Sequence, residues 1–213
     1  MDKQYQYKTE MFTALAQMAK GLASDSRLVI LHLLFQAPST VETLAKESGL
    51  SVANTSRHLQ VLKQSNLVKS VKDGNYIIYS LANYKIYDLI NLLIDIGEDE
   101  IADFKKAQNT ANSEPGVKTI SLADAKKIKA HSFMLDARTE HEYNEGHVDG
   151  AVNIPYTEIE EHLQELPKNQ PIIVYCRGRL CPITNDVTKE LNDNGFEAYS
   201  LNNTCRDWQE LNC

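Results

Sequence analysis

The sequence predicts two domains of different fold class: a mainly helical domain with one β-hairpin, then an α/β domain with a parallel sheet. Apolar residues recur at helical spacing through residues 8–105, interrupted by a strand–turn–strand pattern at 67–81. After a polar segment, short apolar strands alternate with helical stretches, which is typical of a parallel sheet covered by helices. We therefore assign residues 1–106 to the first domain, 107–118 to a linker and 119–213 to the second domain.

The elements of the first domain follow from periodicity and turn chemistry. Ser39 and Glu42 form a capping-box pattern, so we expect Ser39 to cap a helix. Asp73-Gly74 favours the backbone twist of a two-residue hairpin turn. The last helix has an apolar side that fits either its own core or a dimer interface. The expected helices span 11–22, 26–35, 39–48, 52–65 and 84–106, and the hairpin spans 67–81.

The helix over 52–65 follows a tight glycine turn and has a polar outer face, and a basic hairpin comes next. Two helices joined by such a turn and followed by a hairpin form a winged helix-turn-helix, an all-α fold apart from its wing. Short polar side chains and an arginine in the first half of the second helix suit contacts in a major groove. Lysines on the hairpin suit DNA phosphates. The expected DNA-binding residues are Asn54, Thr55, Arg57, His58, Lys69 and Lys72.

The stretch "LASDSRLVILHLLFQAPSTVETLAKESGLSVANTSRHLQVLKQSNLV" resembles the arsenic-repressor (ArsR) family of bacterial regulators. The resemblance covers roughly residues 10–105, and "SRHLQVLKQSNLV" is its most specific part. It implies a symmetric homodimer formed by the first and last helices of the domain. It also implies a double-stranded DNA operator as partner and a signal that changes operator binding.

Many members of that family sense metals through cysteines in the helix before the turn, or through His and acidic residues on the last helix. Residues 39–48 and 84–106 contain neither Cys nor His. Transition-metal sites in proteins need such soft or imidazole ligands. We therefore expect no metal and no cofactor, and we expect the signal to act elsewhere in the chain.

Charge and cysteine content set the expected compartment. Residues 1–106 hold twelve of the 22 Lys+Arg and twelve of the 29 Asp+Glu, so the rest of the chain carries the whole net charge of −7. No apolar stretch is long enough to cross a bilayer, and the first residues lack the apolar core of a signal peptide. We expect a cytoplasmic protein with no membrane partner. All four cysteines lie in the last 38 residues, which places any thiol chemistry in the second domain.

In the second domain, Cys176 directly follows the apolar run "QPIIVY", and Pro182 suits the start of the next helix. The turn between them is expected to curl at a helix N-terminus, where backbone amides and the helix dipole favour an anion. Arg177 and Arg179 add positive charge. These features predict a lowered pKa and high reactivity for Cys176. The expected strands are "FMLDA", "AVNIP", "PIIVYC" and "FEAYSL", and the expected helices lie near 121–129, 158–166, 182–194 and 206–211.

The stretch "MLDARTEHEYNEGHVDGAVNIP" followed by "IIVYCRGRLC" resembles the rhodanese (sulfurtransferase) domain, over roughly residues 118–213. The resemblance implies a five-stranded parallel sheet, a persulfide on Cys176 and a sulfane-sulfur donor as partner. Asp136 and Arg138 are expected to be scaffold residues. The markers of the resemblance are Asp136-x-Arg138, Gly146-His147-Val148-x-Gly150-Ala151, Asn153-Ile154-Pro155 and the cysteine after the strand.

The loop departs from many active rhodaneses, which carry glycine fourth and arginine last. Here Gly178 is third and Cys181 is last. Cys181 is either a small buried residue at the helix start or a resolving thiol for Cys176. Cys205 is either a second candidate for that role or a bystander. Cys213 is expected to be exposed or disordered at the terminus, and Trp208 to anchor the core.

Three functions are compatible with these patterns. The first is a transcription regulator whose rhodanese domain, with Cys176, Arg177, Arg179 and Cys181, senses or processes reactive sulfur. The second is primarily a sulfurtransferase enzyme, in which the winged domain serves dimerisation or tethering. The third is phosphatase or arsenate-reductase chemistry, which the loop disfavours because those active sites need one more residue and a closing arginine. Repression and activation both stay open.

Overall fold

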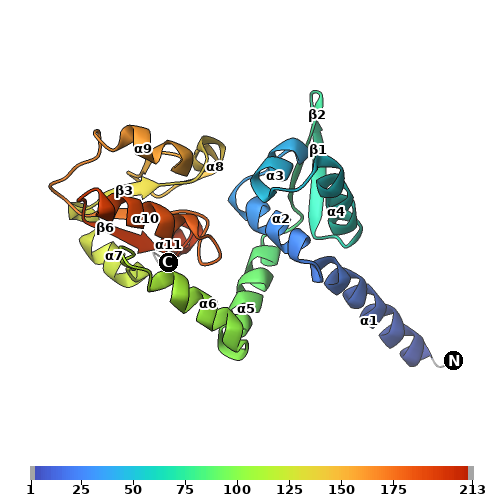
Figure 1. The fold of residues 1–213 in the computed structure, drawn as a ribbon. Helices are drawn as coiled ribbons and strands as arrows, with labels where there is room; N and C mark the ends of the chain where they lie inside the picture. The colour runs from blue at the N-terminus through green and yellow to red at the C-terminus, as the bar shows by residue number, and fades with distance from the viewer. Residues whose placement is uncertain (1–2, 211–213) are drawn as a thin grey trace. The chain divides into compact units, whose positions relative to one another are not determined.

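The computed structural model describes residues 3–210, so the terminal Cys213 lies outside the described residues. The chain divides into two compact units, Met1–Ile94 and Asp95–Cys213. Figure 1 shows a helical unit with one hairpin and an α/β unit, which confirms the predicted fold class. Within residues 3–210, no helix is both long enough and apolar enough to span a bilayer.

The first unit is built around α2, whose leucines and isoleucine are buried among the neighbouring helices. Ile30 and Leu31 of α2 are fully buried, as are Leu59 and Leu62 of α4. Strands β1 and β2 pair antiparallel around the Asp73-Gly74 turn, so the predicted hairpin is confirmed. The elements of this unit are α1 (Lys3–Leu22), α2 (Asp25–Gln36), α3 (Val41–Ser48), α4 (Val52–Gln64), β1 (Val68–Asp73), β2 (Tyr76–Leu81) and the first part of α5 (Lys85–Glu100), a helix that continues into the second unit.

The predicted cap of α3 is wrong by one residue. The side chain of Thr40, not Ser39, accepts the hydrogen bond from the Thr43 backbone N–H, at 3.2 Å. Ser39 is instead drawn into β-structure, because its backbone exchanges hydrogen bonds with Tyr79 of β2 at 2.9 and 2.8 Å. A pairing with a distant strand therefore decides where the helix begins.

The single helix predicted over 84–106 is two helices, α5 and α6 (Ala102–Asn112), with an extended residue at Ile101 between them. Glu98, Asp99 and Glu100 crowd the carboxyl end of α5, where negative charge opposes the helix dipole. The ring of Phe104 lies over Gly97, since a Cβ built on that glycine would be 3.7 Å from two ring atoms. The acidic end and this ring contact fix the corner between the helices.

The second unit contains a parallel four-stranded sheet in the order β4-β3-β5-β6. The fifth strand implied by the family resemblance is reduced to one parallel bridge between Thr119 and Ser200. The other elements are α7 (Leu122–Ile128), β3 (Phe133–Asp136), α8 (Glu140–Glu145), β4 (Val152–Asn153), α9 (Ile159–His162), β5 (Ile172–Tyr175), α10 (Ile183–Asp193), β6 (Ala198–Leu201) and α11 (Cys205–Glu210).

Helices cover both faces of this sheet, and the residues of β5 alternate between the two cores. Ile172 and Val174 face a core that includes Val187 and Leu191 of α10. Ile173 and Tyr175 face a second core, which Trp208 of α11 completes while only 5% exposed. Because both faces of the strand are buried, it reads as a continuous apolar run. Trp208 is the core anchor that the sequence predicts.

Residues 107–118, assigned to a linker from their composition, begin as the last turns of α6. The Asn112 side-chain oxygen accepts hydrogen bonds from Asn185 at 3.0 Å and Asn202 at 3.1 Å. The Gly116 carbonyl accepts a further bond from Asn192 at 2.8 Å. This polar segment is thus part of the second unit and is bonded to the rest of it, and composition alone does not separate that case from a free connector.

Candidate functional site

The predicted DNA-binding helix is α4, capped by Ser51, whose side chain accepts the Asn54 backbone N–H at 3.3 Å. Asn54 and Arg57 are exposed on its outer face and His58 is half-buried. Leu59 and Leu62 hold the opposite face to the core. The helix thus presents a polar and basic surface in its first half, as a groove-binding helix requires.

Thr55 does not belong to this surface, and its prediction as a DNA contact is wrong. Its side chain is fully buried, and its hydroxyl donates a hydrogen bond to the Ser51 carbonyl at 3.0 Å. Position 55 lies one turn before Leu59, so helical periodicity carries it to the inner face. A threonine there satisfies its own hydroxyl within the helix.

The wing adds basic residues to the same unit. Lys69 and Lys72 of β1 are exposed. Lys63 near the end of α4 donates a hydrogen bond to the Ser70 hydroxyl at 2.7 Å and so ties the helix to the wing. Residues 1–94 contain ten Lys+Arg and seven Asp+Glu, a positive net charge in a chain that is acidic as a whole.

The cysteine loop begins where the sheet changes its direction of winding. The strand after β3, β4, pairs on one side of β3, whereas the next strand, β5, pairs on its other side. The carboxyl ends of β3 and β5 therefore lie on either side of a topological switch point. Open α/β sheets bind ligands at such points. Cys176 follows β5 directly, and α10 starts just after Pro182. Gly178 has φ +89°, and a Cβ there would come within 2.8 Å of Thr204. Only glycine fits this turn.

The two loop thiols meet inside the protein, with 3.5 Å between the sulfurs of Cys176 and Cys181. Their hydrogen bond lowers the pKa of Cys181 to about 7, and the backbone N–H groups of Ile183 and Arg177 add to this effect against burial. The same hydrogen bond, together with burial, raises the pKa of Cys176. The prediction that Cys176 has the lowered pKa is therefore wrong. Of the two thiols, Cys181 is therefore the one that loses its proton more readily.

Both loop arginines are engaged by carboxylates, so neither is the open cationic cradle that the sequence suggests. Arg177 is buried and donates to Glu142 of α8 at 2.7 and 2.9 Å. Burial raises the pKa of Glu142, but the hydrogen bonds and charge of Arg177 outweigh it and leave that pKa below its ordinary value. Arg179 contacts Asp95 at 2.7 Å and Glu98 at 2.8 Å, both at the end of α5.

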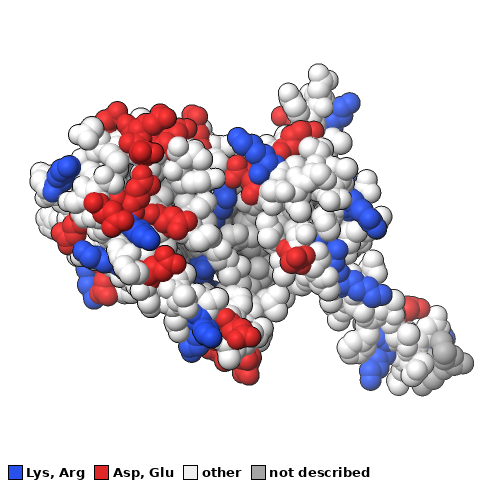
Figure 2. Space-filling model, in the orientation of Figure 1, with Lys and Arg blue, Asp and Glu red and all other residues white. Residues whose placement is uncertain are grey.

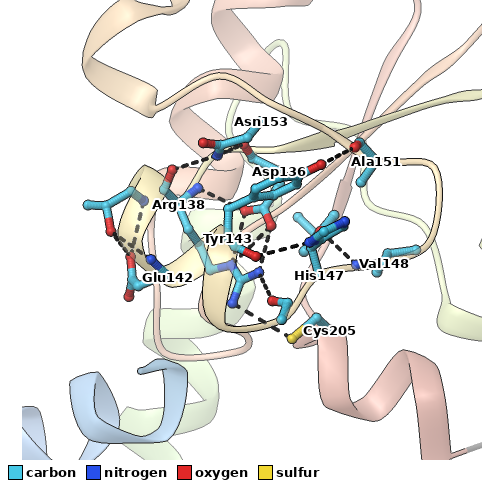
Figure 3. Close-up of polar contacts among 12 residues, drawn as sticks. Asp136, Arg138, Glu142, Tyr143, His147, Val148, Ala151, Asn153 and Cys205 are labelled. Carbon is cyan, nitrogen blue, oxygen red and sulfur yellow. Dashed lines mark hydrogen bonds and ion pairs between the residues drawn. The ribbon is translucent and has the colours of Figure 1, made fainter. Parts of the chain in front are cut away.

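Arg138 holds the loops around this site together, which is the scaffold role that the sequence predicts. Its guanidinium contacts Asp136 at 2.6 Å with both side chains fully buried, and it donates to the Gly146 carbonyl at 2.7 Å. Asn153 binds the carbonyls of Asp136 and Arg138, each at 2.9 Å. Figure 3 shows Arg138 reaching the Cys205 sulfur as well, at 3.7 Å. This contact gives Cys205 a structural partner, and Cys181 is the thiol that lies beside Cys176.

Two family models match separate parts of the chain. The model of bacterial regulatory proteins of the arsR family matches residues 24–70, and the model of the rhodanese-like domain matches residues 120–211. The HTH-type transcriptional regulator Rv0324 of Mycobacterium tuberculosis is 30% identical over 204 residues, which cover 95% of this chain and 90% of that protein. The chain belongs to the arsR family of transcription regulators. This member carries a C-terminal rhodanese-like domain.

Two further similarities each cover less than half of this ArsR-family regulator. The cadmium resistance transcriptional regulatory protein CadC of Listeria innocua is 37% identical over 84 residues, 39% of this chain and 71% of that protein. The solution structure of the homodimeric winged helix-turn-helix DNA-binding domain of Mb0332 from Mycobacterium bovis is 29% identical. It covers 48% of this chain and 95% of that chain, with a TM-score of 0.45.

In the described part of this ArsR-family chain, no group of three or more His, Cys, Asp or Glu side chains is placed to hold a metal ion. Sequence reasoning missed the carboxylates that pair with the loop arginines. The sequence near Glu142 does contain an indication, because Thr139 and Glu142 have the spacing of a capping box. The two residues form that box at the start of α8. No sequence pattern indicates that Asp95 and Glu98 pair with Arg179, because they are about eighty residues away from it in the chain.

Proposed function

We propose that this ArsR-family regulator binds operator DNA as a homodimer and that sulfane sulfur, reacting at the Cys176–Cys181 pair, changes its operator affinity. The observation that carries the proposal is the pair of thiols 3.5 Å apart, in a loop whose Arg179 is bound to carboxylates of α5. A thiolate beside a second thiol takes up a sulfur atom and then closes a disulfide.

The DNA-binding half of the proposal is supported by exposure and charge in the first unit. Asn54, Arg57 and the half-buried His58 line the outer face of α4, with Lys69 and Lys72 on the wing. The second unit has the opposite character: in Figure 2, Asp and Glu side chains gather over the face that bears α8 and α9. Phosphate repulsion disfavours that acidic face as a DNA-binding surface.

Homodimerisation is supported by apolar side chains that α1 and α5 leave in solvent. Along α5, Ile86, Ile90 and Ile94 are buried in its own core, whereas a second stripe of the same helix is exposed. A second copy would cover that stripe and the apolar face of α1, and the Mb0332 domain is described as homodimeric. The exposed apolar residues are Tyr5, Tyr7, Met11, Phe12 and Leu15 on α1, and Leu89, Leu92, Leu93 and Ile96 on α5.

Arg179 supplies the link from sulfur chemistry to the dimer helix. It lies between Cys176 and Cys181 in the chain and contacts Asp95 and Glu98 of α5. Disulfide formation brings the sulfurs from 3.5 Å to about 2 Å apart, which contracts the loop that carries Arg179. The contraction breaks or displaces the ion pairs that Arg179 makes with α5. The change at the cysteine loop thereby reaches the helix that carries the exposed apolar stripe.

The enzyme alternatives make different demands on the loop. Sulfurtransferase activity is supported by the match to the rhodanese-like domain and requires sulfur to leave for an acceptor instead of closing a disulfide. Phosphatase chemistry needs an arginine free to bind a tetrahedral oxyanion, but Glu142 engages Arg177, and Asp95 and Glu98 engage Arg179. The regulator function fits both halves of the chain.

Arg57→Ala is expected to weaken operator binding, by about 1–3 kcal/mol for a base-reading arginine. The measurement is a titration of a fragment of the protein's own promoter at fixed salt.

Lys72→Ala is expected to weaken binding to all DNA sequences alike and to lower the slope of log affinity against log salt concentration by about one. Lys85→Ala removes an exposed lysine that is not part of the proposed surface and serves as the control. Equal binding by Arg57→Ala and Lys85→Ala would exclude α4 as the DNA-reading helix.

A further inference from the structure

A cavity of about 470 Å³ lies beside the cysteine loop, and all of its lining residues belong to the second unit. One wall is α6 with the end of α5, and the other is the loop 179–182 with the start of α10. The volume is in the range of small-molecule sites. Neither family match includes α6, so this wall is an addition to the rhodanese-like domain.

The walls of the cavity are mainly apolar, and its polar groups are already paired. The side chains of Asn185 and Asn202 both donate hydrogen bonds to the side-chain oxygen of Asn112. Glu98 accepts from Gln108 at 2.7 Å and from Arg179 at 2.8 Å. The cavity therefore offers contact surface to an apolar group and no free charge to an anion. Its apolar lining comprises Phe104, Ala107, Ala111, Leu180 and Pro182.

The cavity reaches one thiol of the pair. Cys181 is a lining residue and is 8% exposed, whereas Cys176 does not line the cavity and is 0% exposed. A molecule held in the cavity therefore meets the Cys181 sulfur first, and Cys176 lies behind it at 3.5 Å. In this order Cys181 reacts with the donor before Cys176, although Cys176 is the cysteine that directly follows β5.

We propose that the cavity binds an organic hydropersulfide, R–S–SH, with its apolar R group against α6 and its terminal sulfur at Cys181. The proposal deepens the proposed function, because it names the class of sulfur donor and the thiol that receives the sulfur. An inorganic dianion such as thiosulfate is a poor fit, since burying its charge requires a free cation or unpaired donors. Both arginines of the loop are held by carboxylates.

The reaction then proceeds in two displacements. The Cys181 thiolate attacks the terminal sulfur of R–S–SH, the donor's S–S bond breaks, and its electron pair leaves with RS⁻, which is protonated to RSH. Cys176 loses its proton and attacks the Cys181 sulfur, so that the Cys176–Cys181 disulfide forms and HS⁻ leaves and takes up a proton. In total, two thiols and one hydropersulfide give one disulfide, RSH and H₂S. The hydropersulfide is the oxidant and the thiol pair is oxidised.

The test compares donors and variants of the full chain, with benzyl hydropersulfide and thiosulfate as probes and peptide mass analysis as the readout. In Cys176→Ser the second step is blocked, so Cys181 is expected to gain and keep one sulfur atom. In Cys181→Ser, Cys176 is expected to stay unmodified over the same time. Wild type is expected to form the disulfide at least about tenfold faster with benzyl hydropersulfide than with thiosulfate.

The cavity itself is tested by filling it. Ala111→Phe is expected to slow the reaction with benzyl hydropersulfide by at least about tenfold, while Thr110→Phe, on the other face of α6, leaves the rate within about twofold of wild type. Ala107→Phe fills the same space from another position, and Trp208 fluorescence confirms that each variant is folded.

Two results overturn the assignment while the proposed regulator stands: Cys176 gaining sulfur in Cys181→Ser at the wild-type rate, or equal rates in Ala111→Phe, Ala107→Phe and Thr110→Phe. If neither thiol of wild type reacts with any sulfane-sulfur donor, including inorganic polysulfide, the proposed function fails together with the donor assignment.

Discussion

Asp136→Ala is expected to destabilise the second unit by about 3–5 kcal/mol, because it leaves the guanidinium of Arg138 buried without its carboxylate. Arg138 is 1% exposed and cannot reach solvent without opening the loops that it connects. An arginine guanidinium stays protonated in proteins even without its carboxylate partner, so the cost cannot be relieved by deprotonation. The loops most affected carry Gly146 and Asn153.

The measurement is urea unfolding followed by tryptophan fluorescence. Trp208 is the only tryptophan and lies in the core of the second unit, so its signal reports that unit alone. Asp124→Ala is the matched control, since Asp124 pairs with Lys127 on the surface and its loss is expected to leave the midpoint unchanged. A midpoint for Asp136→Ala as high as that of Asp124→Ala would show that the buried pair is not structural.

Phe12→Glu is expected to separate the homodimer into monomers and to lower operator affinity by at least about 100-fold, since two linked DNA-reading units gain that much over one. Phe12 is 62% exposed on α1, so the substitution leaves the core of the first unit intact. Its effect arises in the dimer, where a buried carboxylate without a partner strongly opposes association. Sedimentation at micromolar concentration and promoter titration measure the two effects.

Gln17→Glu introduces the same charge on the opposite face of α1 and serves as the control. Residues 12 and 17 are separated by well over a quarter turn, so a stripe that contains Phe12 excludes Gln17. The control is expected to sediment as a dimer and to bind the promoter as wild type does. A dimeric Phe12→Glu protein would remove α1 from the interface.

The fold could be predicted closely because its signals are local. The burial of β5 on both faces, the Asp73-Gly74 turn and the leucines of α4 each follow from short stretches of sequence. Errors arose where a distant contact decides the local structure. Ser39 looks like a cap until Tyr79 of β2 pairs with it.

The candidate site was predictable in its residues and less so in its electrostatics. The sequence places Cys176 and Cys181 on one loop after a strand, and the structure brings their sulfurs together. The paired state of the arginines depends on Glu142, Asp95 and Glu98, which come from other elements. The cavity depends on the break at Ile101, after which α6 lines the cavity opposite the loop 179–182. The spacing of residues along the chain does not predict these contacts, because they join elements that are distant in the sequence.

The most direct test of the central claim is operator affinity before and after treatment with a hydropersulfide, for wild type, Cys176→Ser and Cys181→Ser. Disulfide formation contracts the loop and disturbs the Arg179 ion pairs with α5, so the wild-type affinity is expected to change by at least about tenfold, or 1.4 kcal/mol. Both variants lack the disulfide and are expected to keep their affinity. A wild-type change below about twofold, or ~0.4 kcal/mol, would show that the cysteine loop does not control DNA binding and would favour the sulfurtransferase function.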